Sequence, residues 1–256
     1  MKRLAVLLIL IFTATLPVHA NEDVVLGLSQ NRIAITANFD GSEILIFGAV
    51  KRDGPIPAGN PLDVVVAIEG PSAALTVRRK ERKFGIWVNT DTMHVDSAPA
   101  FYAVAASGPL KEVLTETEDQ RHHISIPETI KAIGATEEVA DPQPFTDAVI
   151  RIRGASGLYQ ILENQVEIAE QTLFRTSVAL PSNLTEGHYK TRVFLTRDGK
   201  VVSHYETTID VQKVGLERFL FNLSREKPLI YGLMSLAIAI AAGWGASAFF
   251  RIFQRT

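Results

Sequence analysis

The sequence predicts a mainly β protein: an exported β-sandwich body of immunoglobulin-like type with a partly helical middle segment, followed by a single C-terminal transmembrane helix. Three observations predict it. Short β-branched runs alternate with turn residues between Val24 and Ala106, the two ends of the chain are far more apolar than the middle, and no cysteine is present. With 46% hydrophobic and 21% charged residues among 256, the composition excludes a disordered chain, a collagen-like rod and a disulfide scaffold.

Residues 1–20 have the pattern of a secretory signal peptide. Lys2 and Arg3 form a basic start, an unbroken apolar run covers Leu4 to Ile11, and Ala20 places a small residue at the expected cleavage edge. An uncleaved N-terminal anchor is the alternative. We expect the mature chain to begin directly after this segment.

A second apolar block predicts a transmembrane helix over residues 228–250. The stretch from Leu229 to Phe250 is 22 residues long and carries no charge, so at ~1.5 Å per residue it can cross a hydrocarbon core of roughly 30 Å. Arg251 and Arg255 follow, and basic residues favour the cytoplasmic side. We therefore expect a single-pass protein whose exported body lies in the bacterial periplasm or outside a cell, with residues 251–256 as a cytoplasmic tail.

The expected body, residues 21–225, is acidic. It holds 21 basic and 27 acidic residues, which gives a net charge of −6. Nonspecific nucleic-acid binding requires basic residues that neutralise phosphates, so we expect no nucleic-acid partner. An exported body without cysteine must be stabilised by its hydrophobic core, and a chain of this length can build one.

Residues 21–108 are expected to form an N-terminal β-sandwich-like region. Asp40-Gly41 between two β-branched runs predicts a hairpin, and the apolar run that ends at Gly70-Pro71 predicts a buried strand. The expected strands are Arg32–Ala37, Glu43–Val50, Asp63–Glu69, Ala74–Arg78, Phe84–Asn89 and Met93–Val95.

Residues 109–165 differ in character. Acid-rich stretches at Leu110–Glu116 and Ile126–Ile133 predict helices, and a longer helix is expected at Phe145–Gln165. This middle segment is either a separate unit or an insertion within one sandwich. Residues 166–214 return to β structure, with strands expected at Glu167–Leu180, His188–Thr196 and Val201–Val211.

Two features close to the membrane predict contacts. Residues 215–227 place apolar side chains on one helical face, which predicts an amphipathic helix in the lipid interface; these are Leu216, Phe219, Leu220 and Leu223. Small residues of the span share one helical arc and predict packing against a partner helix; these are Gly232, Ser235, Ala239, Gly243 and Ala246. A plain alanine-rich anchor is the alternative.

The densest charge cluster covers residues 78–83, five bases around one acid, and Trp87 lies on the strand that follows. We predict an anion-binding site that suits an oxyanion, an acidic polymer or anionic lipid headgroups. Its expected members are Arg78, Arg79, Arg82, Lys83 and Trp87. The alternative is a solvated hairpin end, or basic side chains that balance acids of the body.

No pattern of catalytic or metal-binding residues stands out in the sequence. His188 and His204 flank the last expected hairpin and can face each other, but no ligand spacing such as H-E-x-x-H occurs. The histidines of the expected mature chain are His94, His122, His123, His188 and His204. The nucleophile elbow, the phosphate-binding loop and the dinucleotide fingerprint are also absent. We predict no metal and no cofactor, and no sequence motif supports an enzyme.

Five stretches carry a resemblance to a known family. They are Val25-Leu-Gly-Leu-Ser29, Ile35-Thr-Ala-Asn-Phe-Asp-Gly41, Val77-Arg-Arg-Lys-Glu-Arg82, Phe101-Tyr-Ala-Val-Ala-Ala-Ser107 and Gly215-Leu-Glu-Arg218. Together they resemble an alphaproteobacterial family of transmembrane proteins, from about Val24 to the end of the span. The resemblance implies a signal peptide, an exported periplasmic body and one C-terminal span in the bacterial inner membrane, and it brings no catalytic residues because the family has no established activity.

The resemblance also implies an accessory role beside an integral membrane protein, such as a sulfite-exporter-like permease. The function predicted is therefore that of a single-pass accessory or interaction protein in contact with the lipid bilayer. A membrane-tethered periplasmic module that binds an anion or a polymer is the alternative.

Overall fold

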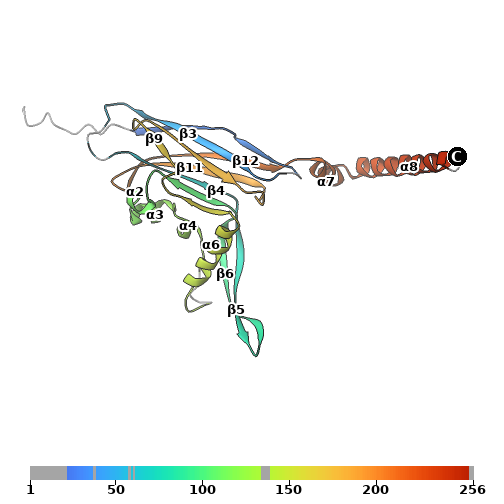
Figure 1. Cartoon of the computed structure of the whole chain (residues 1–256), viewed down its shortest axis with the longest axis horizontal. Helices are drawn as coiled ribbons and strands as arrows, with labels where there is room; N and C mark the ends of the chain where they lie inside the picture. The colour runs from blue at the N-terminus through green and yellow to red at the C-terminus, as the bar shows by residue number, and fades with distance from the viewer. Residues whose placement is uncertain (1–21, 37–38, 57–58, 60, 134–138, 254–256) are drawn as a thin grey trace, which may run out of the picture.

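Two packed β-sheets form the body of the protein (Figure 1). The computed structural model describes residues 22–36, 39–56, 59, 61–133 and 139–253, so the expected signal peptide lies outside the described residues. One sheet has four strands, in the order β1 (Glu22–Leu28), β3 (Ser42–Arg52), β10 (Leu173–Leu180) and β9 (Glu167–Ala169). The other has six, in the order β2 (Arg32–Ile35), β12 (Lys200–Lys213), β11 (Gly187–Arg197), β4 (Asp63–Glu69), β7 (Tyr102–Ala106) and β8 (Tyr159–Leu162). The mainly β prediction is confirmed, whereas its immunoglobulin-like detail stays a prediction.

The two sheets enclose the main hydrophobic core. Strand β10 shows the pattern of a sheet with one solvent-exposed face, because its alternate residues from Phe174 to Leu180 are buried and the residues between them are exposed. Strand β4 is buried on both faces, as the sequence predicts. Its residues Val64, Val66 and Ile68 belong to the core between the sheets, and Val65 and Ala67 belong to a second core on the other side.

The described helices of residues 109–165 lie over that second core on the outer face of the six-stranded sheet, and they contribute Val113, Ile126 and Val149 to it. They are α2 (Leu110–Val113), α3 (Glu116–His122), α4 (Ile126–Thr129) and α6 (Gln143–Ala155). The longer helix expected at 145–165 is wrong in its second half. The helix ends at Ala155, Gly157 takes a left-handed φ of +71°, and the chain then enters β8, which pairs with β7 in parallel.

The hairpin expected between residues 32–37 and 43–50 is also wrong. Strand β2 pairs in parallel with β12, whereas β3 pairs with β1 and β10. The chain changes sheets at residues 29–31, so β1 and β2 belong to opposite layers of the sandwich. The last residue of the first expected strand, Ala37, lies outside the described residues.

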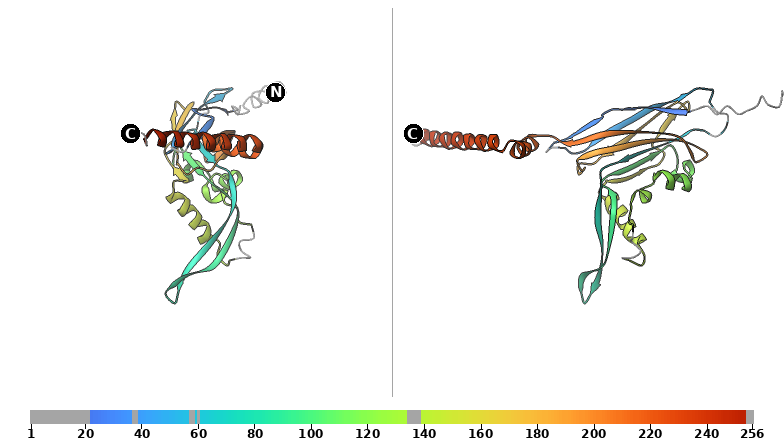
Figure 2. Two further views of the ribbon diagram at one scale, coloured as in Figure 1. Left: turned by 90° about the vertical axis from the view of Figure 1, so that its right-hand side faces the viewer. Right: turned by 180° about the vertical axis from the view of Figure 1, so that it is seen from behind.

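Strands β5 (Ser72–Lys83) and β6 (Ile86–Pro99) form a long hairpin, here called the arm. Of the three short strands predicted in this region, Ala74–Arg78 lies within β5 and Met93–Val95 within β6, whereas Phe84–Asn89 begins in the turn between them and continues into β6. Figures 1 and 2 show the arm projecting from the body to one side, away from the direction in which the C-terminal helices leave. Those helices are α7 (Leu216–Glu226) and α8 (Pro228–Phe253), and α8 extends beyond the body.

Candidate interaction surface on the arm

The base of the arm is held by a small hydrophobic core of its own. Met93 and Val95 of β6 are buried against Phe145 of α6, together with Ala98. Leu75 and Val77 of β5 pack against the same core. An isolated two-stranded hairpin is at best marginally stable in water, so this contact with α6 stabilises the base of the arm.

The strand register divides the arm into two faces. Residues directly opposite one another in an antiparallel pair share a face, and Val77 lies opposite Met93 and Arg79 opposite Asp91. These residues form the inner face, which is turned toward α6, and the Arg79 guanidinium lies 4.8 Å from the centre of the Phe145 ring. Further out, the same face carries Glu81 opposite Val88 and Lys83 opposite Ile86.

Both acids of the arm strands near the basic cluster lie on the inner face. Arg79 Nη1 is 3.5 Å from an oxygen of Asp91, and Lys83 Nζ is 3.8 Å from an oxygen of Glu81. These two basic residues therefore have carboxylate partners inside the arm. Because all four side chains are substantially exposed, the two pairs contribute little to stability.

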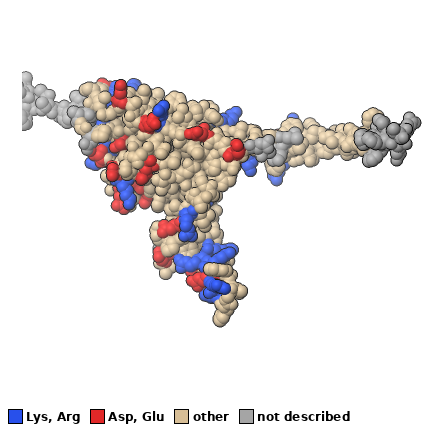
Figure 3. All heavy atoms as spheres, in the orientation of Figure 1, with Lys and Arg blue, Asp and Glu red and all other residues tan. Residues whose placement is uncertain are grey.

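The outer face of the arm is free of acids along the basic cluster. It carries Arg78, Lys80 and Arg82 along β5, at alternate positions, and Trp87 opposite Arg82 on β6. Asn89 lies opposite Lys80. Within the described part of the chain, no carboxylate pairs with any of the three basic side chains. Figure 3 shows Lys and Arg side chains gathered toward the end of the arm, with fewer Asp and Glu side chains among them.

The tip of the arm exposes three large apolar side chains. Phe84, Ile86 and Trp87 have exposed fractions of 106%, 65% and 67%. Phe84 and Gly85 form the turn, and both take positive φ angles, of 51° and 85°. These side chains contribute little to the hydrophobic core, and neighbouring exposed apolar side chains are typical of contact surfaces.

The structure separates the predicted anion-binding residues into two groups. Arg78, Arg82 and Trp87 lie together on the outer face, whereas Arg79 and Lys83 lie on the inner face beside acids. Lys80 belongs with the first group and was missed by the sequence prediction. Strand alternation is the signal that identifies it, since residues 78, 80 and 82 of one strand must share a face.

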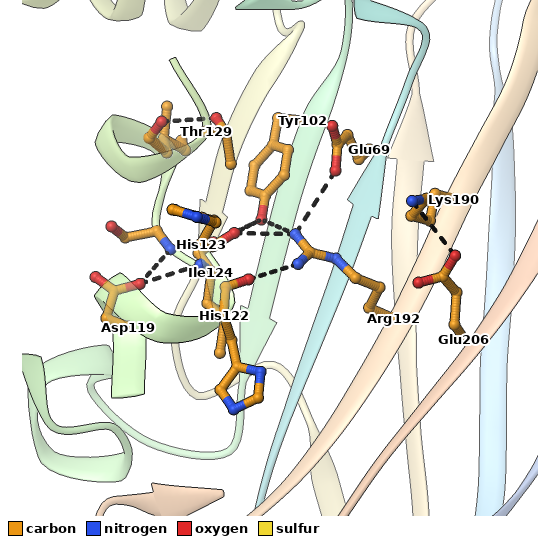
Figure 4. A network of polar contacts seen from close by, with 12 residues as sticks. Glu69, Tyr102, Asp119, His122, His123, Ile124, Thr129, Lys190, Arg192 and Glu206 are labelled. Carbon is orange, nitrogen blue, oxygen red and sulfur yellow. Dashed lines mark hydrogen bonds and ion pairs between the residues drawn. The ribbon is translucent and has the colours of Figure 1, made fainter. Parts of the chain in front are cut away.

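A second polar cluster, around Arg192 of β11, supports the helical layer (Figure 4). Arg192 donates to the carbonyl oxygens of His122 and His123 at 2.6 and 3.0 Å, and the Tyr102 hydroxyl donates to the Ile124 carbonyl at 2.6 Å. These carbonyls follow the end of α3, where a helix lacks its own donors. Burial raises the pKa of Tyr102, so the hydroxyl stays protonated. The hydrogen bonds of this cluster all stay within the fold, so its role is structural.

His122 and His123 are adjacent in the chain, and the His122 ring contacts that of His204. His122 ends α3, its ring lies 5.9 Å from that of His204, and desolvation lowers its pKa. The expectation that His188 and His204 face each other is wrong, because His188 pairs with Asp210 and His204 with Phe194. No three side chains of His, Asp or Glu among the described residues are placed to hold a metal ion.

A buried group of three charges joins three strands at one end of the sandwich. The Glu22 carboxylate accepts a hydrogen bond from Arg52 Nε at 2.5 Å and two from Arg197, at 3.0 and 2.9 Å. The hydrogen bonds from Arg197, together with those from Arg52, lower the pKa of Glu22. All three side chains are nearly inaccessible to solvent, so this cluster ties β1 to β3 and β11 and offers no site to a ligand.

Helix α8 contains the segment that can cross a membrane. Residues Pro228–Ser247 are apolar, with a mean hydropathy of 1.8, and none of that stretch is buried against the rest of the chain. The small residues predicted to pack against a partner lie on this helix, and a Cβ atom added at Gly232 or Gly243 would meet open space. Of the amphipathic face in α7, Phe219 is exposed, and the side chain of Leu216 lies outside the described residues.

Comparison with protein families decides where the chain belongs. A family model described as "Putative transmembrane protein (Alph_Pro_TM)" matches residues 23–252, which include the sandwich, the arm and α8. The chain belongs to this family. Among the described residues, α8 is the one helix long and apolar enough to span a bilayer, which fits a single-pass membrane protein of unknown activity.

Other comparisons add little to this assignment. Among solved structures, this chain is similar to the sporulation control protein Spo0M from Bacillus subtilis, at 10% sequence identity and a TM-score of 0.27. The similarity covers 80% of this chain and 55% of the Spo0M chain, so this chain spans little more than half the length of Spo0M. No curated protein sequence matches.

Proposed function

We propose that this single-pass membrane protein is an accessory or interaction protein for another integral membrane protein. Its signal peptide directs the body to the periplasm of a bacterium, α8 anchors it in the inner membrane, and the C-terminus lies in the cytoplasm. The observation that supports the proposal is the arm, which carries an exposed apolar tip and an acid-free basic face away from the body.

The composition of the tip supports a protein contact. Burial of one large apolar side chain contributes roughly 1.5–3 kcal/mol, and Trp and Arg dominate the energetics of protein interfaces. The arm combines Trp87 with Arg82 on one face and adds Phe84 at the turn. Without a partner, these exposed apolar side chains would promote aggregation and would add nothing to the stability of the fold.

The direction of the arm supports a partner that lies beside this protein in the plane of the membrane. The arm points to the side of the line along which α8 leaves the body (Figure 2). With α8 across the bilayer, the tip is directed toward the extracytoplasmic part of a neighbouring protein. The small-residue face of α8 gives the same neighbour a second contact within the membrane, because small residues let helix backbones approach closely. A sulfite-exporter-like permease is the partner that we test first.

A second candidate function is a tethered module that binds an anion or an acidic polymer. It is favoured by the sorting of acids away from the outer face, which leaves Arg78, Lys80 and Arg82 without carboxylate neighbours. In that case the bound group is small or polymeric, and the apolar tip plays no part in recognition.

The test is purification of the tagged full-length protein from native membranes, with identification of the proteins that co-elute. We expect an integral membrane companion whose recovery falls at least tenfold when Phe84 and Trp87 are both changed to Ser. Leu173→Ser, at a side chain that is 56% exposed on β10 of the sandwich, is the matched control and leaves recovery unchanged. Gly243→Leu tests the membrane contact separately.

Two results would contradict the proposal. Recovery of the protein alone from native membranes would favour the tethered binding module. A companion that is retained by the Phe84→Ser and Trp87→Ser double variant would remove the arm from the interaction.

A further inference from the structure

The two strands of the arm differ in regularity, because β6 contains bulges and β5 does not. In the pairing of β5 with β6, the register shifts twice, between Ala73 and Leu75 and between Arg79 and Lys80. At each shift β6 advances by one residue more than β5, so both extra residues are in β6. Bulges of this kind interrupt a strand edge and prevent further pairing. Strand β5 is regular along its whole length.

The edge of β6 is also partly covered. Near the base, Asp96 and Ser97 donate backbone hydrogen bonds to the Lys131 carbonyl, and Lys131 donates to Ser97 in return. The Asp96 carboxylate accepts a hydrogen bond from the backbone of Ile133. No described residue pairs with the second edge of β5, which has β6 as its single neighbour. An edge strand with unpaired backbone groups is a template for another strand.

The charges on β5 match a strand that carries acids at alternate positions. Arg78, Lys80 and Arg82 are spaced by two residues each, which is about 6.6 Å along a strand at ~3.3 Å per residue. A strand added beside β5 presents its own side chains with the same repeat and on the same two faces. Acidic residues at positions i, i+2 and i+4 of that strand would therefore lie beside the three basic ones, and cross-strand pairs of opposite charge are favourable.

The same three basic side chains exclude most other strands. Basic residues on an edge repel strands that carry basic residues and discourage pairing between copies of one chain. The backbone groups of this edge are free to pair, but its basic side chains repel basic strands, so only an acidic strand is accepted. Specificity is obtained in this way by penalising the wrong partners.

We propose that the arm recognises its partner by strand addition: an extended segment of the partner pairs with the free edge of β5 and places acidic side chains, at alternate positions, opposite Arg78, Lys80 and Arg82. This inference rests on the proposed function, since it names the chemistry of the contact that the arm makes. The added strand turns a two-stranded ribbon into a three-stranded sheet, which is the smallest sheet with independent stability.

A bilayer surface is the competing ligand for a basic and apolar hairpin. The observations favour a strand, because the unpaired basic residues form a single file on one strand and the arm points to the side of α8. A lipid-binding hairpin has no need of a regular open edge on one strand and bulges on the other.

The experiment uses the full-length protein in nanodiscs of zwitterionic lipid. The chain has two tryptophans, Trp87 and Trp244, so Trp244→Phe leaves Trp87 as the single fluorescent reporter, on the face in question. The probe is a synthetic nine-residue peptide in which Glu alternates with Val and Thr, titrated to low millimolar concentration. Three further probes are a peptide of the same composition with its Glu residues adjacent, an alternating peptide N-methylated on its pairing edge, and vesicles that contain anionic phospholipid.

We expect a saturable shift of Trp87 emission with the alternating peptide. The adjacent-Glu peptide binds at least tenfold more weakly, and the N-methylated peptide does not bind. Changing Arg78, Lys80 and Arg82 to Gln abolishes the shift. Arg79→Gln, at a basic residue of the same strand that faces inward, is the matched control and preserves it.

Three outcomes overturn the inference. Equal binding of the alternating, adjacent-Glu and N-methylated peptides would show that the arm is a simple anion patch. A response to anionic vesicles alone would assign the arm to the bilayer, and no response to any probe would refute strand addition. The proposed function fails separately, through the loss of arm dependence in co-purification, so the two failures can be told apart.

Discussion

Glu22 supports the sharpest prediction about stability. Its carboxylate is the shared acceptor for Arg52 and Arg197, and the three side chains are only 4%, 7% and 12% exposed. Glu22→Gln removes the negative charge and leaves two buried guanidinium groups facing a neutral amide. Removal of one partner from a buried ion pair costs about 3–5 kcal/mol, because the remaining charge stays desolvated.

The assay is thermal unfolding of the full-length protein in detergent, followed by the β-sheet signal in circular dichroism. For a body of this size, a loss of 1 kcal/mol lowers the Tm by about 2–4 °C, so Glu22→Gln lowers it by about 6–20 °C. The matched control is Glu167→Gln. Glu167 forms a 2.6 Å ion pair with Arg175, but both side chains are 69% exposed, and an exposed pair contributes less than about 1 kcal/mol. Similar Tm shifts for the two variants would refute the argument that burial sets the cost.

Three further predictions concern the same fold. Because the folded pKa of Glu22 is lowered from 4.5, its contribution to stability is complete above that value and disappears as the pH falls through the folded pKa; Glu22→Gln removes this part of an acid unfolding curve. Tyr102→Phe leaves the Ile124 carbonyl without its 2.6 Å donor and lowers the unfolding free energy by about 1–3 kcal/mol in urea titrations. Met93→Ala empties the core at the base of the arm, costs about 2–5 kcal/mol, and accelerates hydrogen exchange in β5 before the sandwich.

The sequence identifies those elements whose burial is visible locally. The run from Asp63 to Glu69 is apolar throughout, and the structure buries it between two cores. The span is recognisable from length and the absence of charge. Strand β2, in contrast, pairs with β12 across most of the chain. No local turn chemistry encodes a pairing of such long range, so the nearby Asp40-Gly41 turn suggested a hairpin that does not form.

The arm is hard to predict for a different reason, because part of its regular strand has no strand-like sequence pattern. Residues 78–83 are all charged and lack the β-branched side chains that mark a strand, yet they continue β5 without interruption. Their extended conformation depends on cross-strand pairing with β6 and on the support of α6 at the base. The charge cluster itself is evident from sequence. Its division into an acid-free face and a paired face requires the register, including the extra residues in β6 that no sequence pattern marks.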